Sequence, residues 1–104
     1  MARRLIWSQN SRKIRKEILE YWKKRNKSAV YSKKLNTLFT ESAQQIFDFP
    51  FSGIRISGTL FRGKLIRDYY LLYEFDEETV TILFIWDTRQ NPTELLKFIK
   101  GFQK

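Results

Sequence analysis

The side chains that could do chemistry in this chain are arginine, lysine, tyrosine and carboxylates, because its 104 residues include no histidine and no cysteine. Histidine is the commonest general base and the commonest metal ligand, and cysteine supplies nucleophiles and thiolate ligands. Any catalysis must therefore use cations, tyrosine hydroxyls or carboxylates. Because the sequence offers no carboxylate cluster of the kind that holds a cation, we expect no metal and no other cofactor.

The positive charge lies almost entirely in the first third of the chain. The formal net charge is +9, and residues 1–35 hold twelve Lys or Arg against only Glu17 and Glu20. The remaining residues are close to neutral, with eight cations and nine carboxylates. A patch of one sign favours phosphate backbones or an acidic protein partner, and salt would weaken binding to either. The alternative is a lysine-rich helix surface that serves only solubility.

The elements that must position these side chains begin with a sheet. The runs 69–75 and 79–86 are rich in β-branched and aromatic residues, and the acidic turn 76–78 separates them, which predicts a β-hairpin. A third run, 60–66, precedes them, and 4–8 is expected as an opening strand at the sheet edge. The pattern predicts an antiparallel meander whose middle and last strands form the spine of the sheet.

In the last strand, apolar residues occupy both the odd-numbered and the even-numbered positions, which predicts a central strand covered on both faces. With simple alternation, one face carries Val80, Ile82, Phe84 and Trp86, and the other carries Thr81, Leu83 and Ile85.

Two amphipathic helices are expected to cover this sheet. Apolar residues recur at helical spacing over 11–25, and the pattern restarts at Tyr31 and continues to Phe49-Pro50, where proline stops it. The short polar linker between them predicts an antiparallel helical hairpin. The possible N-caps of the first helix are Ser8, Asn10 and Ser11.

A short C-terminal helix is expected after the sheet. Asn91 has the position of an N-cap, Pro92 is suited to the first helical position, and Gly101 is the expected end. Residues 1–104 are therefore predicted to form one α+β domain. No apolar run approaches the roughly 20 residues that span a bilayer, and no apolar signal region follows Arg3 and Arg4, so we expect a cytoplasmic protein that does not enter a membrane.

The residues of the sheet also carry a resemblance to a known family. The run Asp68–Phe75, the acidic turn, the run Val80–Trp86 and the segment Asp87–Pro92 look like the sheet region of the RelE/ParE superfamily of toxins from bacterial toxin–antitoxin modules. The first strand, the two helices and the Phe49-Pro50 exit are similar too, so the likeness covers nearly the whole chain. It implies the same fold that the pattern predicts.

The two branches of this superfamily imply different mechanisms. Members of the RelE branch resemble small ribonucleases that cut messenger RNA in the ribosomal decoding site, whereas the ParE branch shares the fold and inhibits DNA gyrase. Cleavage by a ribose 2′-hydroxyl needs a proton acceptor, a donor to the leaving oxygen and stabilisation of the phosphorane's charge. Clustered cations on a sheet face can supply that stabilisation, which is often the largest single contribution to the rate.

The resemblance assigns catalytic roles to five residues. Arg89 matches the arginine that follows the last strand and is the first candidate for binding the scissile phosphate, which a guanidinium can hold through two hydrogen bonds. Arg62 and Lys64, two apart on one strand and so on one face, match the basic pair of the ribonuclease branch. Tyr70 stands where that branch has an arginine and is the candidate proton-transfer group, and Arg67 is the candidate replacement for that arginine.

Ordinary structural roles remain the alternative for the same residues. A solvated strand face would also account for Arg62, Lys64 and Arg67. For Arg89 the structural alternative is an ion pair with Asp87 or Asp68. The ribonuclease branch also has a tyrosine or histidine near its C-terminus. In this chain only Phe98 and Phe102 are available there, and phenylalanine cannot transfer a proton.

We therefore expect the toxin of a two-component module, whose partner is a cognate antitoxin with an acidic amphipathic segment over the basic helices and the sheet. Ribosome-associated cleavage of messenger RNA is placed first as its mechanism. The alternatives are a ParE-like inhibitor of DNA gyrase without catalysis, a degenerate toxin that only binds its antitoxin, and a plain nucleic-acid-binding domain.

Overall fold

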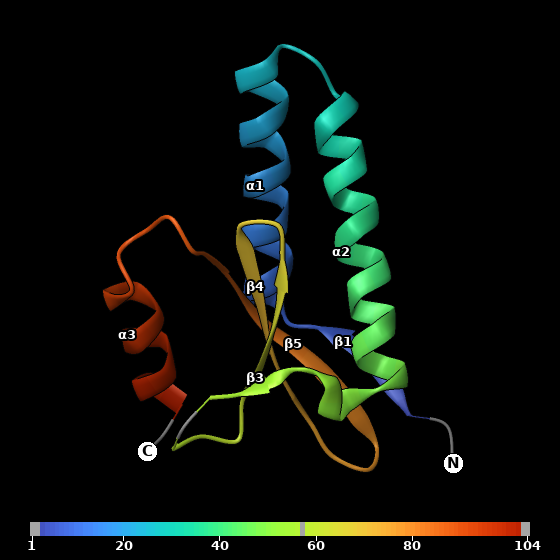
Figure 1. Cartoon of the computed structure of the whole chain (residues 1–104), viewed down its shortest axis with the longest axis vertical. Helices are drawn as coiled ribbons and strands as arrows, with labels where there is room; N and C mark the ends of the chain where they lie inside the picture. The colour runs from blue at the N-terminus through green and yellow to red at the C-terminus, as the bar shows by residue number, and fades with distance from the viewer. Residues whose placement is uncertain (1–2, 57, 103–104) are drawn as a thin grey trace.

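The two longest strands form the centre of the sheet, as their apolar sequences predict (Figure 1). The computed structural model describes residues 3–56 and 58–102, apart from the side chains of Glu94, Phe98 and Phe102. The strands in this part are β1 (Arg4–Trp7), β2 (Ile54–Arg55), β3 (Arg62–Ile66), β4 (Tyr69–Phe75) and β5 (Thr79–Asp87). These five strands pair in the order β1-β5-β4-β3-β2.

The sheet is mixed. Strands β2 to β5 pair antiparallel, which confirms the predicted meander, and β1 lies at the edge as expected but runs parallel to β5. It is parallel because the chain leaves β1 through both helices before it enters the rest of the sheet. The β4–β5 turn has the predicted position, and the Asp76 carboxylate accepts hydrogen bonds from the backbone N–H groups of Glu78 and Thr79, both at 2.8 Å.

The predicted helical hairpin is present as α1 (Gln9–Asn26) and α2 (Val30–Asp48), followed by a short 3-10 turn, η1 (Pro50–Ser52). Ser8 is the N-cap of α1, because its hydroxyl accepts a 3.0 Å hydrogen bond from the Ser11 N–H. Lys27, with a φ of 52°, ends α1 in the left-handed conformation. Among the described residues, no helix has both the length and the apolar character needed to cross a membrane.

The sheet is covered on both faces, as the composition of β5 predicts. One face, which we call the hairpin face, is covered by the helical hairpin of α1 and α2. It holds the main core, in which Leu35, Phe39 and Ile46 of α2 are fully buried. The other face is covered by α3 (Thr93–Phe102), whose Ile99 joins a smaller core with Phe61, Leu72 and Leu83. Figure 1 shows α3 across the sheet from the hairpin.

The ends of α3 differ slightly from the prediction. The Asn91 side chain accepts a 3.0 Å hydrogen bond from the Thr93 N–H, as a capping residue does, but the helix begins at Thr93 and not at the predicted Pro92. At its other end the helix continues one residue past Gly101. Between η1 and β3, the two residues Ile54–Arg55 form the short strand β2, and Ser57 lies outside the described residues.

The predicted division of β5 between the two faces is right up to Leu83 and wrong from Phe84 onward. Leu72 of β4 lies opposite Phe84 and Tyr73 lies opposite Ile82, so Leu83 is an extra residue in β5. Such a β-bulge reverses the alternation of side chains that follows it. Val80, Ile82 and Ile85 therefore share the core under the hairpin, whereas Leu83 and Phe84 join the core under α3.

Tyr73 links the sheet to the segment that leaves α2. Its fully buried hydroxyl donates a 2.6 Å hydrogen bond to the Pro50 carbonyl and accepts a 3.0 Å bond from the Gly53 N–H. Both backbone groups would lose a partner without this hydroxyl, and a buried polar group left unpaired is costly.

Tyr73→Phe is therefore expected to lower the free energy of unfolding by about 1–3 kcal/mol, as measured by urea denaturation. Tyr70→Phe is the matched control, because the Tyr70 hydroxyl makes no hydrogen bond within the described residues, and its effect should stay within about 0.5 kcal/mol. Equal losses in the two variants would contradict this role for Tyr73.

Candidate functional site

The bulge in β5 brings Asp87 to the hairpin face, where it meets Arg89. Asp87 lies opposite Tyr69, whose side chain belongs to the core under the hairpin. Arg89 donates to both carboxylate oxygens of Asp87, from Nε at 3.0 Å and from Nη2 at 2.9 Å, and its backbone N–H donates to the same carboxylate at 2.9 Å. The alternative of an ion pair between Arg89 and Asp87 is thus present in the structure.

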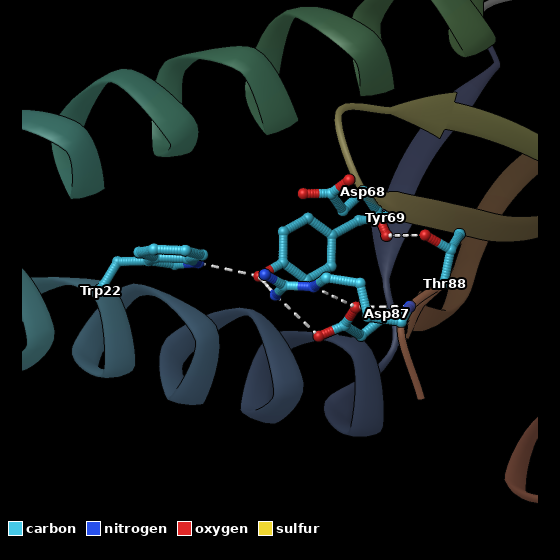
Figure 2. Close-up of polar contacts among 6 residues, drawn as sticks. Trp22, Asp68, Tyr69, Asp87 and Thr88 are labelled. Atoms are coloured by element: carbon cyan, nitrogen blue, oxygen red, sulfur yellow. Dashed lines mark hydrogen bonds and ion pairs between the residues drawn. The ribbon is translucent and has the colours of Figure 1, made fainter. Parts of the chain in front are cut away.

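Two aromatic side chains support this ion pair. Trp22 of α1 donates a 2.8 Å hydrogen bond from Nε1 to the hydroxyl of Tyr69, which is 2% exposed (Figure 2). The Arg89 guanidinium carbon lies 5.4 Å from the centre of the Trp22 ring and 5.9 Å from that of Tyr69. These cation–π contacts fix the direction of the arginine while 46% of its side chain stays exposed. Arg89 can therefore be reached by a partner.

The local electrostatics keep this pair ionised at neutral pH. The hydrogen bonds from Arg89 lower the pKa of Asp87, and the same interaction raises the pKa of Arg89. Burial raises the pKa of Tyr69 from its ordinary value of 10.0, so this phenol stays protonated. The positive charge of Arg89 is therefore largely balanced by Asp87, and an anionic partner must compete with that carboxylate.

A cleft of about 440 Å³ lies beside the pair, between α1 and the end of β5. Ile14, Ile18 and Tyr21 line its helix side, and Ile85, Asp87 and Arg89 line its sheet side. Strand β1 ends opposite Ile82, so in the part of the chain that the structure describes the last residues of β5 are paired with β4 on one side and with no strand on the other. The cleft thus has apolar and aromatic walls, and its charged side chains are Glu17 on the helix and the Asp87–Arg89 pair at the end of β5.

Arg62 and Lys64 share the hairpin face, as predicted, but Arg62 lies at the opposite corner of the sheet from Arg89. Arg62 is opposite Tyr73 and Asp87 is opposite Tyr69, which separates them by about 14 Å along the strands and about 10 Å across them. Arg62 donates to the Gly53 carbonyl at 2.9 Å and lies 5.2 Å from the Phe51 ring centre. These contacts hold the segment that follows α2 in place.

Tyr70 lies on the other face of the sheet. It stacks on Trp86 with 6.1 Å between ring centres and 14° between ring planes, and its strand neighbour Leu72 belongs to the core under α3. Successive side chains of a strand point to opposite faces, so the hydroxyl of Tyr70 is separated from Arg62, Lys64 and Arg89 by the sheet itself.

The backbone segments that carry Arg67 and Arg89 lie side by side in space. It is exposed at the β3–β4 turn with a φ of 56°, and within residues 3–56 and 58–102 its side chain makes no hydrogen bond or ion pair. The Asp68 carbonyl accepts 2.8 Å hydrogen bonds from both the N–H and the hydroxyl of Thr88, which hold this turn beside the end of β5 (Figure 2). The structure therefore brings Arg67 and Arg89 to one end of the sheet, with Arg62 at the far corner and Tyr70 on the opposite face.

The contact of Trp22 and Tyr69 with Arg89 was not predicted from the sequence. Their helical and strand spacing shows which face each occupies, but their meeting depends on how far α1 extends over the sheet. The side chains of Phe98 and Phe102, which stand where the ribonuclease branch has an acid–base residue, lie outside the described residues. In the described part, no three His, Cys, Asp or Glu residues gather as a metal site would require.

Comparison with known proteins identifies one family. The family model described as "ParE toxin of type II toxin-antitoxin system, parDE" matches residues 5–92, which include every strand and both helices of the hairpin. A search of curated proteins finds no match to the chain. The family match ends just before α3.

Asp87→Asn is expected to lower the free energy of unfolding at pH 7 by about 0.5–1 kcal/mol, the range for a partly exposed ion pair. Because the folded pKa of Asp87 lies below its ordinary 3.8, the stability from this pair is present above pH 3.8 and is lost as pH falls through the lowered folded value. The difference between wild type and variant should therefore shrink in acid, as urea denaturation at several pH values would show.

Asp68→Asn provides the control, since it removes the same charge from an exposed residue whose carboxylate forms no hydrogen bond in the described part of the chain. If the Asp87→Asn difference stayed constant from pH 7 down to acid, the ion pair would not be its cause.

Proposed function

Since the chain belongs to the ParE toxin family of type II toxin–antitoxin systems, we propose that it acts by binding its target without catalysis, and that this target is DNA gyrase. A toxin of this class has a cognate antitoxin as its partner. Gyrase is the target that the resemblance to the ParE branch implies. The proposal reverses the order of the two mechanisms expected from sequence.

The separation of the five candidate residues carries this proposal. Cleavage of RNA requires a proton-transfer group and the charge-stabilising cations around one phosphate, within hydrogen-bonding reach of it. Tyr70 lies across the sheet from the cations, and Arg62 lies at the far corner with its guanidinium on backbone carbonyls. Of the five, Arg67, Tyr70 and Arg89 lie at one end of the sheet, but Tyr70 is on the opposite face from Arg89.

The chemistry at that end also favours binding. Tyr69 is the titratable phenol nearest to Arg89, and burial moves its pKa away from the neutral range in which a general base works best. Arg89 is already held by Asp87 and two aromatic rings. An arginine fixed by aromatic rings at the end of a largely aromatic and aliphatic cleft is typical of a surface that recognises another protein.

Cleavage of messenger RNA is the second candidate, and one observation favours it. Arg67 is exposed without an ion pair in the described residues, and its turn is held beside Arg89 by Asp68 and Thr88. Two guanidinium groups could then bind one phosphate, with a proton acceptor supplied by the ribosome and not by this chain.

A supercoiling assay tests the proposed target directly. The purified toxin should block supercoiling of relaxed plasmid by gyrase and ATP, and addition of the antitoxin should restore it. Arg89→Ala should require at least tenfold more toxin for the same inhibition, because the truncation of a central arginine commonly costs 2 kcal/mol or more in binding, by an order-of-magnitude estimate. Unaffected gyrase, together with cutting of ribosome-bound mRNA, would contradict the proposal.

Tyr70→Phe separates binding from catalysis. If Tyr70 transfers no proton, removal of its hydroxyl should leave growth arrest after controlled expression unchanged within about twofold. The substitution should not disturb the fold, because this hydroxyl makes no hydrogen bond in the described part of the chain. A variant that folds normally but no longer arrests growth would favour the ribonuclease mechanism.

A further inference from the structure

The α1–α2 turn carries a dense patch of positive charge that the proposed function does not use. Between residues 23 and 34 the chain has six cations and no carboxylate, and all six are exposed. We call this set the turn patch: Lys23, Lys24, Arg25, Lys27, Lys33 and Lys34. Figure 1 shows the turn between the two helices at the top of the molecule, projecting beyond the sheet.

The turn patch is not neutralised by the rest of the protein. Within the described residues, the Arg89–Asp87 contact is the one ion pair, so none of the six cations has a carboxylate partner there. Their side chains also take no part in hydrogen bonds in this part of the chain. By contrast, Arg15 of the same helix is used inside the protein, where it donates to Asn36 and Thr40 and lies over the Trp7 ring.

Folding explains only part of this charge. Lys23, Lys24 and Arg25 occupy the last turn of α1, where cations interact favourably with the negative end of the helix dipole. Lys33 and Lys34 are near the start of α2, where the dipole disfavours cations. That end of α2 has no acidic residue in its first turn and no side-chain cap at Ala29. These two lysines therefore gain nothing from the helix they belong to.

The surface around the patch favours a nucleic acid over an acidic protein segment. An amphipathic segment of an antitoxin needs apolar surface to bury, and between residues 23 and 34 Val30 is the one large apolar side chain that is mostly exposed. The apolar surface of α1 lies lower, at Ile14, Ile18 and Tyr21 in the cleft. A sugar–phosphate backbone requires only positive charge, which the turn supplies.

We infer that the turn patch binds the sugar–phosphate backbone of duplex DNA. The choice of DNA rests on the proposed function, because gyrase acts on duplex DNA and a toxin bound to it lies close to that duplex. The contact is without base specificity, since exposed lysines approach phosphates as point charges.

Fluorescence anisotropy with a labelled duplex, at several salt concentrations, tests this inference on the full-length toxin. The turn variant K23Q/K24Q/K33Q/K34Q is compared with R12Q/K13Q/K16Q/K100Q, which removes four exposed cations elsewhere. Both variants lower the net charge of +9 by four. Thermal unfolding should show the turn variant to be about as stable as the wild type, because the removal of two cations from the start of α2 offsets the loss of two from the last turn of α1.

The turn variant should bind the duplex at least tenfold more weakly than the wild type at 0.15 M salt, whereas the control should lose less than threefold. The slope of log affinity against log salt should fall by about 0.9 for each phosphate contact that the turn variant loses. Equal losses in the two variants would overturn the inference, since binding would then depend on total charge. Tighter binding of RNA than of DNA would overturn the assignment to duplex DNA.

A supercoiling assay with the same proteins separates this inference from the proposed function. If the wild type fails to inhibit gyrase, and DNA binding is weakened in the turn variant but not in the control variant, the proposed target is wrong and the turn patch remains a DNA site. If the wild type inhibits gyrase and the turn variant binds DNA like the wild type, the proposed target stands and the turn patch is not a DNA site.

Discussion

The extra residue in β5 is the constraint on which the site depends. Leu83 interrupts the pairing with β4 between Tyr73 and Leu72 and reverses the faces of the residues that follow. Ile85 and Asp87 thereby join the face under the hairpin. Without the bulge, Asp87 would point towards α3, and Arg89 could not pair with it over Trp22 and Tyr69.

The energy of the Asp87–Arg89 pair suits a binding site. Ion pairs that are partly exposed contribute only about 0–1 kcal/mol, and 46% of the Arg89 side chain is exposed. A carboxylate of a partner could therefore exchange with Asp87 at little cost, while a fully buried pair would resist exchange. Trp22 and Tyr69 keep the guanidinium in place during that exchange through ring contacts that do not depend on Asp87.

Most of the fold follows from local patterns in the sequence. Helical spacing predicted both helices of the hairpin to within a few residues, and Ser8 and Asn91 cap the helices that they were expected to cap. The acidic turn at Asp76 and the central position of β5 were likewise predicted. Each of these features depends on residues that are close in the chain, so a pattern of types and spacing contains the necessary information.

The candidate site was less predictable because its contacts are long-range. A bulge adds one residue without changing the composition of a strand, so the alternation of β5 beyond Leu83 could not be read from its sequence. Arg62 binds the Gly53 carbonyl only because η1 folds back beside β3, and the pattern of neither segment shows this. The resemblance placed Tyr70 among the cations by position in a motif, whereas the strand pleat places it on the opposite face.

The central claim is that this toxin acts by binding gyrase and not by cutting RNA. Controlled expression in bacterial cells tests it most directly, with the 5′ ends of messenger RNA mapped in the same cultures in which gyrase-linked DNA breaks are measured. Binding to gyrase should give growth arrest with DNA breaks and intact messenger RNA. Codon-positioned cuts in messenger RNA without DNA breaks would contradict it.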